Sequence, residues 1–499
     1  MAVLKLSTPG VYVDEVSTFP PSVAEVETAI PAFIGYTEKA DQLTAGDLKL
    51  VANKINNLSE FEHFYGGAPV ETNDSIKVAV TDLGGGIYDV KLTPVETELF
   101  VYNLYYAVKH FYDNGGGTCY IISVNTYATT AAPGTITVAD FTGPNKGLAV
   151  AYEIDEVTLI VVPETCKMAD ADYITVVKKM ILNASELKDR FALIDPKRVT
   201  PKNSNDPNGD IDNDVKIIRD ATASTSENRY AAAYYPFLIS TYAYKYDLDS
   251  LTIDTCQKGT DVTAFSVADF TGKPMHDSGF PNDTSKCVGK GSALYAKIKD
   301  ELGRIYVTLP PSGAIAGLYT RVDSNKGVWK APANESLLSV LMPSIPISSR
   351  EQENLNIDPT SGKSINVIRS FPGYGTLVWG ARTLNGNDNE WKYISVRRFF
   401  NMVEESIKKS IQWAVFEPNT INTWVKVQAM IENYLFLKWR EGALAGVKPE
   451  QAFFVRVGLP ATMTSLDVLE GRMNVEIGMA VARPAEFIIL KFSQLLQQS

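Results

Sequence analysis

The sequence predicts a multidomain protein of the α/β (α+β) class, and three observations support this prediction. Its 499 residues are too many for one ordinary hydrophobic core, so two or three packed units are expected. Over the first two thirds, short apolar runs alternate with amphipathic helical patterns, as in proteins that layer helices on a sheet. After Pro346 the pattern changes to long, strongly periodic helices, so a second kind of domain is expected there.

The first part of the chain alternates between strand and helix patterns. Residues 30–36 form an apolar run that predicts a buried strand. Residues 99–112 predict a helix, because one helical face collects Val101, Leu104, Tyr105, Val108 and Phe111. The glycines at 115–117 stop that helix, and residues 119–124 predict the next buried strand. The same pattern continues with strands at 157–162 and 305–309 and a helix at 174–187.

Three polar stretches, rich in Asn, Asp, Gly, Ser or Thr, predict surface insertions near residues 73–95, 200–228 and 243–287. Residues 206–214 alternate possible oxygen ligands, as a calcium-binding loop does. Counted from Asp206, however, the sixth position is Ile211 rather than Gly, and the twelfth is Ile217 rather than Glu. We therefore expect a solvated acidic loop there and no metal.

Two long helices dominate the last part of the chain. Residues 394–416 predict the first, with an apolar face formed by Val396, Phe399, Phe400, Val403, Ile407 and Ile411. On the other side, Glu404 and Glu405 precede Lys408 and Lys409 by one turn, an order that favours ion pairs. A second helix is expected at 421–440, before Gly442. Strands are then expected at 453–459, 473–481 and 486–492.

Both ends of the chain predict a strand that has no hairpin partner nearby. Residues 10–16 alternate apolar and polar side chains after the turn signal Thr8-Pro9-Gly10. Residues 487–492 (Phe-Ile-Ile-Leu-Lys-Phe) are apolar on both faces, and such a strand favours aggregation unless something covers it. Each of these strands must pair with a distant strand of its own chain or with an edge on another chain.

Charge and hydropathy argue against nucleic acid and membrane partners. The formal net charge is −11, and no run rich in Lys or Arg could follow a phosphate backbone. No window approaches the roughly 20 apolar residues that are needed to cross a bilayer. We expect no nucleic acid partner and no direct membrane insertion.

Residues that support catalysis or bind metals are scarce. None of the three histidines, His63, His110 and His276, stands in a catalytic or zinc-binding motif, and His110 is expected to be solvated or to pair with a helix dipole. The four cysteines form no Cys-x-x-Cys pair, so reduced thiols are expected, with Cys119 and Cys166 buried. Arg397 and Arg398 are expected as a surface pair on their helix. We therefore expect no catalytic residue, no cofactor and no metal site.

An enzyme of another class stays open as the alternative. The helix and strand alternation permits a hydrolase or an NTPase on a doubly wound α/β fold. The glycine runs at 84–86 and 115–117, however, lack the Lys-Ser/Thr of a phosphate-binding loop. The missing motifs disfavour this alternative.

Motifs spread along most of the chain carry a resemblance to a known family. They are Thr8–Val13 (TPGVYV), Ile30–Gly35 (IPAFIG), Asp140-Phe141, Thr158–Pro163 (TLIVVP), Leu309–Asn334, Ile368–Leu384 (IRSFPGYGTLVWGARTL), Tyr393–Glu417 and Arg483–Ile488 (RPAEFI). With these motifs in this order, the chain resembles the contractile tail sheath proteins of phages, pyocin-like particles and extracellular injection systems.

This resemblance implies a structural sheath subunit without enzymatic activity. It implies an exchange arm at 1–20, an outer α/β domain at 21–345, a conserved inner domain at 346–483 and a second exchange arm at 484–499. The arms are strands given to neighbouring subunits, where they complete a small mixed sheet of the inner domain. The exchanged residues would be Val11, Tyr12, Val13 and Val16 in the first arm and Phe487, Ile488, Ile489, Leu490 and Phe492 in the second.

The resemblance also implies the partners and the location of the protein. The chain would form a helical homo-oligomer of stacked, six-membered rings around an inner tube protein, with baseplate and cap or terminator proteins at its ends. Contraction would drive the tube through a target envelope, and the tube-facing candidates are Glu404, Glu405, Lys408 and Lys409. Assembly is expected in the bacterial cytoplasm, as part of a virion tail or of a released or cell-anchored injection particle.

Overall fold

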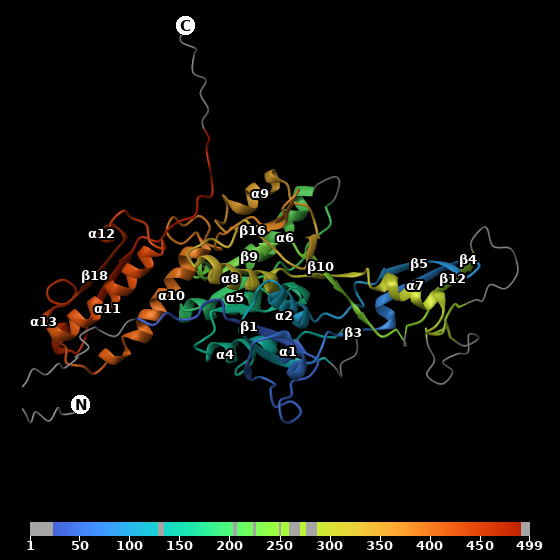
Figure 1. The fold of residues 1–499 in the computed structure, drawn as a ribbon, viewed down its shortest axis with the longest axis horizontal. Coiled ribbons are helices and arrows are strands. Elements are labelled where there is room, and N and C mark those ends of the chain that lie inside the picture. Colours follow the sequence, from blue (N-terminus) through green and yellow to red (C-terminus); the bar gives the residue numbers. More distant parts are fainter. Residues whose placement is uncertain are drawn as a thin grey trace, which may run out of the picture. The chain divides into compact units, whose positions relative to one another are not determined.

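The computed structural model describes residues 23–127, 134–202, 207–222, 226–248, 251–258, 270–275 and 287–490 (Figure 1). The chain divides into two compact units. Unit 1 comprises Met1–Val26 and Val403–Ala482, and unit 2 comprises Glu27–Met402 and Arg483–Ser499. The division falls within helix α10 (Ile394–Ser410) and does not coincide with the expected boundary at residue 346. The expected first strand, residues 10–16, lies outside the described residues.

Unit 2 contains a large mixed sheet whose middle is parallel. Within the described residues its order is β14-β17-β16-β9-β8-β7-β1-β6-β2. These strands are β1 (Pro31–Thr37), β2 (Ala52–Ile55), β6 (Cys119–Thr126), β7 (Leu159–Val161), β8 (Phe191–Ile194), β9 (Ala231–Tyr235), β14 (Glu335–Ser336), β16 (Ile365–Phe371) and β17 (Gly375–Val378). The strands from β16 to β6 run parallel, while β17, β14 and β2 join antiparallel at the two edges. The strands predicted at 30–36, 119–124 and 157–162 are confirmed.

Helices cover both faces of this sheet, which explains why its central strands are apolar throughout. Alternate residues of β1 enter two separate cores, Ala32 and Ile34 on one face and Phe33 on the other. The first face is covered mainly by α3 (Val138–Thr142), α4 (Gly147–Tyr152), α5 (Asp170–Leu187) and α6 (Pro207–Ala221), and the second by α1 (Leu58–Tyr65), α2 (Leu104–Asp113) and α8 (Ser312–Lys326). The α/β prediction is therefore confirmed for this unit.

The polar stretch at 200–228 is not an insertion, and that prediction is wrong. It contains α6, which packs against α5 and buries Ile211, Val215 and Ile218 in the core of the sheet. Asp214, expected in a solvated acidic loop, is fully buried and accepts hydrogen bonds from the Thr200 backbone N–H at 2.6 Å and from the Tyr235 hydroxyl at 3.0 Å. The described residues hold no cluster of potential metal ligands.

The other two polar stretches come together in one small module, which we call the accessory module. It consists of β4 (Ile76–Gly84), β5 (Ile87–Pro94), β12 (Thr255–Lys258) and α7 (Ala293–Leu302). Strand β12 pairs parallel with β4, and β4 pairs antiparallel with β5. A separate hydrophobic core fills the module. Val78 and Val80 come from the stretch at 73–95, Ile253 from the stretch at 243–287, and Leu294 and Ile298 from α7.

Two further small sheets complete unit 2. Strands β3 (Val70–Glu71) and β11 (Lys245–Tyr246) pair parallel where the chain enters the accessory module for the first and for the second time. Strand β10 (Leu238–Ala243) pairs antiparallel with β13 (Tyr306–Leu309) and β15 (Val340–Pro343). The predicted strand at 305–309 therefore exists, but it lies outside the large sheet. Helix α9 (Ser349–Asn356) packs against β16.

Unit 1 is built around α11 (Ile421–Arg440), whose bounds match the predicted helix at 421–440. Helix α11 packs against β18 (Phe453–Val457), which pairs antiparallel with β19 (Val475–Met479). The short helices α12 (Pro449–Ala452) and α13 (Ser465–Leu469) flank β18. Helix α10 ends at Ser410, six residues before the predicted end, and Phe416 beyond it has a positive φ of 66°, which a helix cannot hold.

Candidate assembly surfaces

The described part of the C-terminal arm is an exposed apolar segment. Residues 483–490 form neither helix nor strand, so the strand predicted at 486–492 is not present within this chain as far as Leu490. Its apolar side chains are largely exposed: Phe487 67 %, Ile488 79 %, Ile489 82 % and Leu490 71 %. Phe492 lies outside the described residues. Four consecutive apolar side chains exposed to water indicate a surface that another protein covers.

Glu486 precedes this segment and is bound to unit 2. Its carboxylate accepts two hydrogen bonds from the Arg382 guanidinium, at 2.9 and 2.7 Å, and one each from Asn356 at 2.7 Å and Tyr393 at 3.0 Å. Burial alone would raise the pKa of Glu486, but the hydrogen bonds and charge of its partners hold it below its ordinary value. Sequence analysis missed this site because Arg382 stands far away in the chain and no local pattern joins the two residues.

The two-stranded sheet of unit 1 has unfilled edges. In the described part of the chain, neither β18 nor β19 has a third strand beside it. Partly exposed apolar side chains alternate along β19, with Val475, Ile477 and Met479 on the same side of the strand. An isolated two-stranded sheet is marginally stable, and an extended chain can add to such an edge through backbone hydrogen bonds.

The N-terminal residues that the structure describes run along α10 within unit 1. The backbone N–H groups of Ala24 and Val26 donate to the hydroxyls of Ser410 and Ser406, each at 3.1 Å. Glu25, between them, forms an ion pair with Lys438 of α11. Val11, Tyr12, Val13 and Val16 precede this segment and lie outside the described residues.

The charged residues predicted to face a tube gather around Glu405. Lys408 and Lys409 both pair with the Glu405 carboxylate, at 3.1 and 3.4 Å, and Glu405 itself is buried. The predicted pairing of Glu405 with Lys409 is therefore confirmed. Glu404 is exposed, and 66 % of the Lys408 side chain is exposed, so these two residues are the accessible members of the set.

Arg397 and Arg398 do not form a surface pair, so that prediction is wrong. The Arg398 guanidinium is buried, binds the Asp323 carboxylate at 3.0 and 2.5 Å and stacks on the Tyr319 ring at 4.5 Å. Arg397 stacks on Trp391 at 4.2 Å and donates to Asn401 at 2.7 Å. The burial of Arg398 leaves no local sequence signal, because its partners Tyr319 and Asp323 come from a distant segment of the chain.

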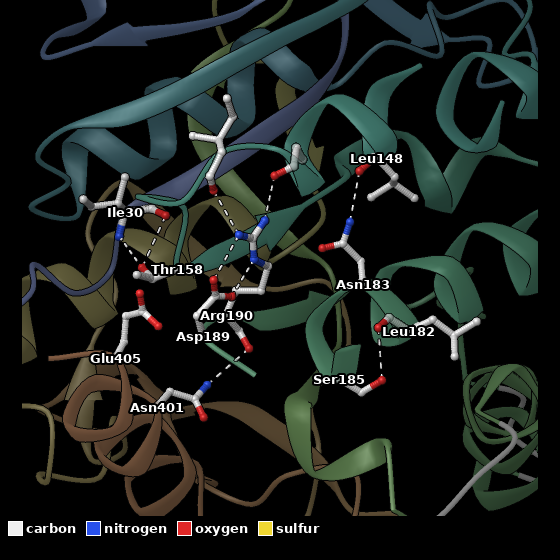
Figure 2. Close-up of polar contacts among 12 residues, drawn as sticks. Ile30, Leu148, Thr158, Leu182, Asn183, Ser185, Asp189, Arg190, Asn401 and Glu405 are labelled. Carbon is white, nitrogen blue, oxygen red and sulfur yellow. Dashed lines mark hydrogen bonds and ion pairs between the residues drawn. The ribbon is translucent and has the colours of Figure 1, made fainter. Parts of the chain in front are cut away.

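Buried polar contacts also fix the first part of α10 within unit 2 (Figure 2). Asn401 donates to the Arg190 backbone carbonyl at 3.2 Å. The Arg190 side chain is 1 % exposed and donates to the carbonyls of Ala151 and Ile154, at 2.6 and 2.9 Å, and to Asp189 at 2.7 Å. It thereby satisfies carbonyl groups at the end of α4 that would otherwise be buried without a partner.

The place where a doubly wound fold binds its ligand is filled by the protein itself. From β1 the chain continues to β6 on one side and later to β7 on the other, so the switch point lies between β1 and β7. There the Glu164 carboxylate accepts from the Tyr36 N–H at 3.4 Å and from the Leu104 N–H, at the start of α2, at 3.2 Å. A Cβ atom on Gly35 would lie 2.5 Å from that carboxylate. Glu164 thus occupies the position at a helix N-terminus where such folds hold an anionic ligand.

Burial raises the pKa of Glu164 to about 8, although backbone N–H groups partly offset this effect. The native state therefore binds more protons than the unfolded chain between about pH 4.5 and pH 8, and its stability falls as pH rises through this range. Glu164→Gln keeps the shape of the side chain but cannot release the proton. Between pH 5 and pH 8 the free energy of unfolding should therefore fall less in this variant than in the unchanged protein, by a difference on the order of 3 kcal/mol. Urea unfolding at pH 5, 6, 7 and 8 measures this, and parallel pH profiles for the two proteins would contradict it.

Other residues considered for chemistry have structural roles. His110 is fully buried rather than solvated, its Nε2 lies 3.2 Å from the Leu338 carbonyl, and burial lowers its pKa to about 4. Cys119 and Cys166 are free and buried, as predicted, and burial raises the pKa of each thiol to about 12. Across the described ranges, no helix is long and apolar enough to cross a membrane.

Comparisons with known proteins agree on one family. The model of the phage tail sheath protein central domain matches residues 134–384, and the model of the phage tail sheath C-terminal domain matches residues 386–494. The tail sheath protein of Enterobacteria phage T4 is 28 % identical over 130 residues, which are 26 % of this chain but only 19 % of that relative.

Two solved structures are similar over nearly the whole chain. The sheath of the anti-feeding prophage in its contracted helical state is 28 % identical, with a TM-score of 0.61 over 98 % of this chain and 99 % of that chain. The contracted PVC sheath complex of an extracellular contractile injection system is 27 % identical, with a TM-score of 0.61 over 98 % of both chains.

Proposed function

Because the chain belongs to the phage tail sheath protein family, we propose that it is the sheath subunit of a contractile, phage-tail-like particle. It polymerises as stacked, six-membered rings around an inner tube, between a baseplate and a terminator. Contraction of the sheath drives the tube through a target envelope. One observation carries this proposal furthest: the exposed apolar arm, Phe487–Leu490, occurs in a chain that also offers the open edges of β18 and β19.

The chemistry of the arms supports exchange of strands between subunits. An arm that adds to the β18–β19 sheet of a neighbour gains backbone hydrogen bonds, and its alternate side chains fix the register. Each apolar side chain that becomes buried contributes about 1.5–3 kcal/mol. Donor and acceptor are different surfaces of one chain, so the contact is heterologous, and it builds a helical lattice where its rotation does not close a ring.

Sheath function also requires energy that is stored during assembly. The extended lattice is held kinetically above a better-packed contracted lattice, so that one trigger releases the whole transition. In this proposal residues 346–483, with the exchange arms of neighbours, form the inner layer of the sheath, and residues 21–345 form the outer layer. The hydrolase or NTPase alternative gains no support from the switch point, since Glu164 fills it.

Electron microscopy of the purified chain tests the proposed function. The full chain should form tubes in negative stain, and a chain without residues 1–18 should stay folded but form none, because it lacks the strand with Val11, Tyr12, Val13 and Val16. Circular dichroism checks the fold of both. A compact monomer with hydrolytic turnover would instead favour the enzyme. Normal tubes from the shortened chain would refute exchange of the first arm.

The proposed contact with the tube is tested at Lys408. We place α10 on the inner wall, with Glu404, Glu405, Lys408 and Lys409 toward the tube. Lys408→Glu should stop growth of the sheath around the tube while tube-free polymerisation continues, because Lys408 is the more exposed of the two lysines that pair with Glu405. Lys409 is kept because it balances the buried Glu405. Lys426→Glu on α11, also an exposed lysine, is the matched control. Complete particles from the Lys408 variant would reject this assignment.

A further inference from the structure

The described part of the C-terminal arm, as far as Leu490, is tied to the subunit through one side chain, Glu486. Within residues 483–490, the hydrogen bonds and the ion pair to the rest of the subunit are all made by the Glu486 carboxylate. After Glu486, the side chains of Phe487–Leu490 are exposed, and before it, Arg483–Ala485 form neither helix nor strand. The point where the arm leaves the subunit is therefore defined by Glu486 alone.

The residues that bind Glu486 are themselves firmly held. Arg382 is 5 % exposed, and its backbone N–H donates to Asn366 at 2.8 Å. A further guanidinium N–H donates to the Gly386 carbonyl at 3.2 Å, which leaves the other side of the group free for both Glu486 oxygens. Bidentate arginine–carboxylate pairs are geometrically specific and stronger than neutral hydrogen bonds. Glu486 thus meets a rigid, preorganised socket on unit 2.

The strand that precedes the arm is poorly suited to resist a pull. β19 belongs to unit 1 and pairs with one strand, β18, in the described residues. Past β19, Ala482 makes its last backbone bond to unit 1, donating to the Ala443 carbonyl at 2.9 Å. A pull at the end of such a strand breaks its hydrogen bonds one at a time, and the sheet that must accept a neighbour's arm would be lost.

We propose that the Arg382–Glu486 pair is a clasp that fixes the root of the C-terminal arm, so that tension on the arm enters unit 2 and does not peel β19. This inference rests on the proposed exchange of strands. It names the two residues that would carry the load when a neighbouring subunit pulls on the exchanged arm. It has two consequences. The arm starts from a fixed point, which lowers the entropy lost when a neighbour captures it. The acceptor sheet stays intact while the donor arm is under tension.

Glu486→Gln tests the clasp with little change of shape. The amide cannot accept both guanidinium N–H groups as a carboxylate does, so the arm root loosens while the fold of unit 2 is kept. The matched control is Asp300→Asn on α7, which removes the same charge from an exposed pair with Arg304. A third protein, ending at Glu486, lacks the arm itself. All three are compared with the full chain.

Three measurements distinguish the possible roles. Thermal unfolding of the monomer should be unchanged in the Gln variant. Methyl relaxation of Ile488 and Ile489 in the labelled monomer should show faster motion, which a purely structural role would not produce. The critical concentration for sheath assembly should rise about tenfold, equivalent to about 1.4 kcal/mol. The Asn control should match the full chain in all three.

The outcomes separate the clasp from the proposed function. If the shortened protein forms no sheath and the Gln variant behaves as described, both are supported. If the shortened protein still forms sheaths, exchange of the C-terminal arm is wrong. If the shortened protein fails while the Gln variant assembles at the wild-type concentration with unchanged methyl motion, the arm is needed but the clasp is wrong. If the Glu486→Gln monomer unfolds at a lower temperature than the full chain, the Arg382–Glu486 pair stabilises the fold of unit 2, and the clasp is wrong in this case as well.

Discussion

Ile489→Asp is expected to abolish sheath formation while the isolated subunit stays folded. Ile489 is 82 % exposed in the single chain, so a charge at this position costs the monomer nothing in packing. In a sheet completed by a neighbour the same side chain would be buried, and an unpaired carboxylate there costs several kcal/mol. Repeated in every subunit of a lattice, that cost stops polymerisation.

Sedimentation and negative-stain microscopy measure the loss of sheaths, and thermal unfolding reports on the monomer. Leu43→Asp is the matched control, since Leu43 is 92 % exposed but lies on a loop far from either arm in the sequence. This control should assemble normally. If the Ile489 monomer unfolds or precipitates, the arm belongs to the core of its own chain, and if sheaths form at normal yield, Ile489 is not part of an interface.

Arg398→Ala is expected to produce the largest loss of stability, about 3–5 kcal/mol. The Arg398 and Asp323 side chains are each 6 % exposed, so the change leaves a carboxylate in the core without its countercharge. Burial by itself would lower the pKa of Arg398, but Asp323 holds it above its ordinary value. Asp323 also accepts from the Thr28 hydroxyl at 2.9 Å, so the segment before β1 loosens as well.

Urea unfolding followed by tryptophan fluorescence measures this loss. Arg304→Ala, just after α7, is the control, because Arg304 also forms ion pairs, with Asp300 and Glu301, but is 60 % exposed. Exposed pairs contribute little, so the control should change the free energy of unfolding by less than about 0.5 kcal/mol. A loss below about 1 kcal/mol for Arg398→Ala would show that the pair adds little to the fold.

Local patterns were enough to predict elements whose signals lie within one segment. Helix α11 was predicted with its correct bounds because its apolar periodicity is unbroken and Gly442 closes it. Strands β1 and β6 were found because parallel strands covered on both faces are apolar throughout. Helix α6 was missed because its first half is rich in Asn and Asp, which hides the spacing of Ile211, Val215 and Ile218.

Features that depend on distant partners could not be read from the sequence. Arg398 resembles any exposed helix arginine until Asp323, 75 residues away, is placed beside it. The socket of Glu486 needs Asn356, Arg382 and Tyr393, which three different segments provide. The parallel pairing of β12 with β4 joins two polar stretches that local composition presents as unrelated loops. Long-range pairing of this kind leaves no periodic signal in either partner.

The accessory module has a consequence for engineering the chain. Its core draws on two excursions that share one entrance, where β3 lies beside β11. Removing the second excursion alone would strip β4 of β12, and removing the first alone would strip β12 of β4. Either deletion would expose part of the hydrophobic core, whereas removing both excursions at the β3–β11 neck takes out a closed unit. A shortened subunit therefore calls for two coordinated deletions. The tight Gly84-Gly85-Gly86 turn between β4 and β5 is a suitable graft point for a displayed peptide, because an insertion at the tip of this hairpin leaves both strand neighbours of β4 in place.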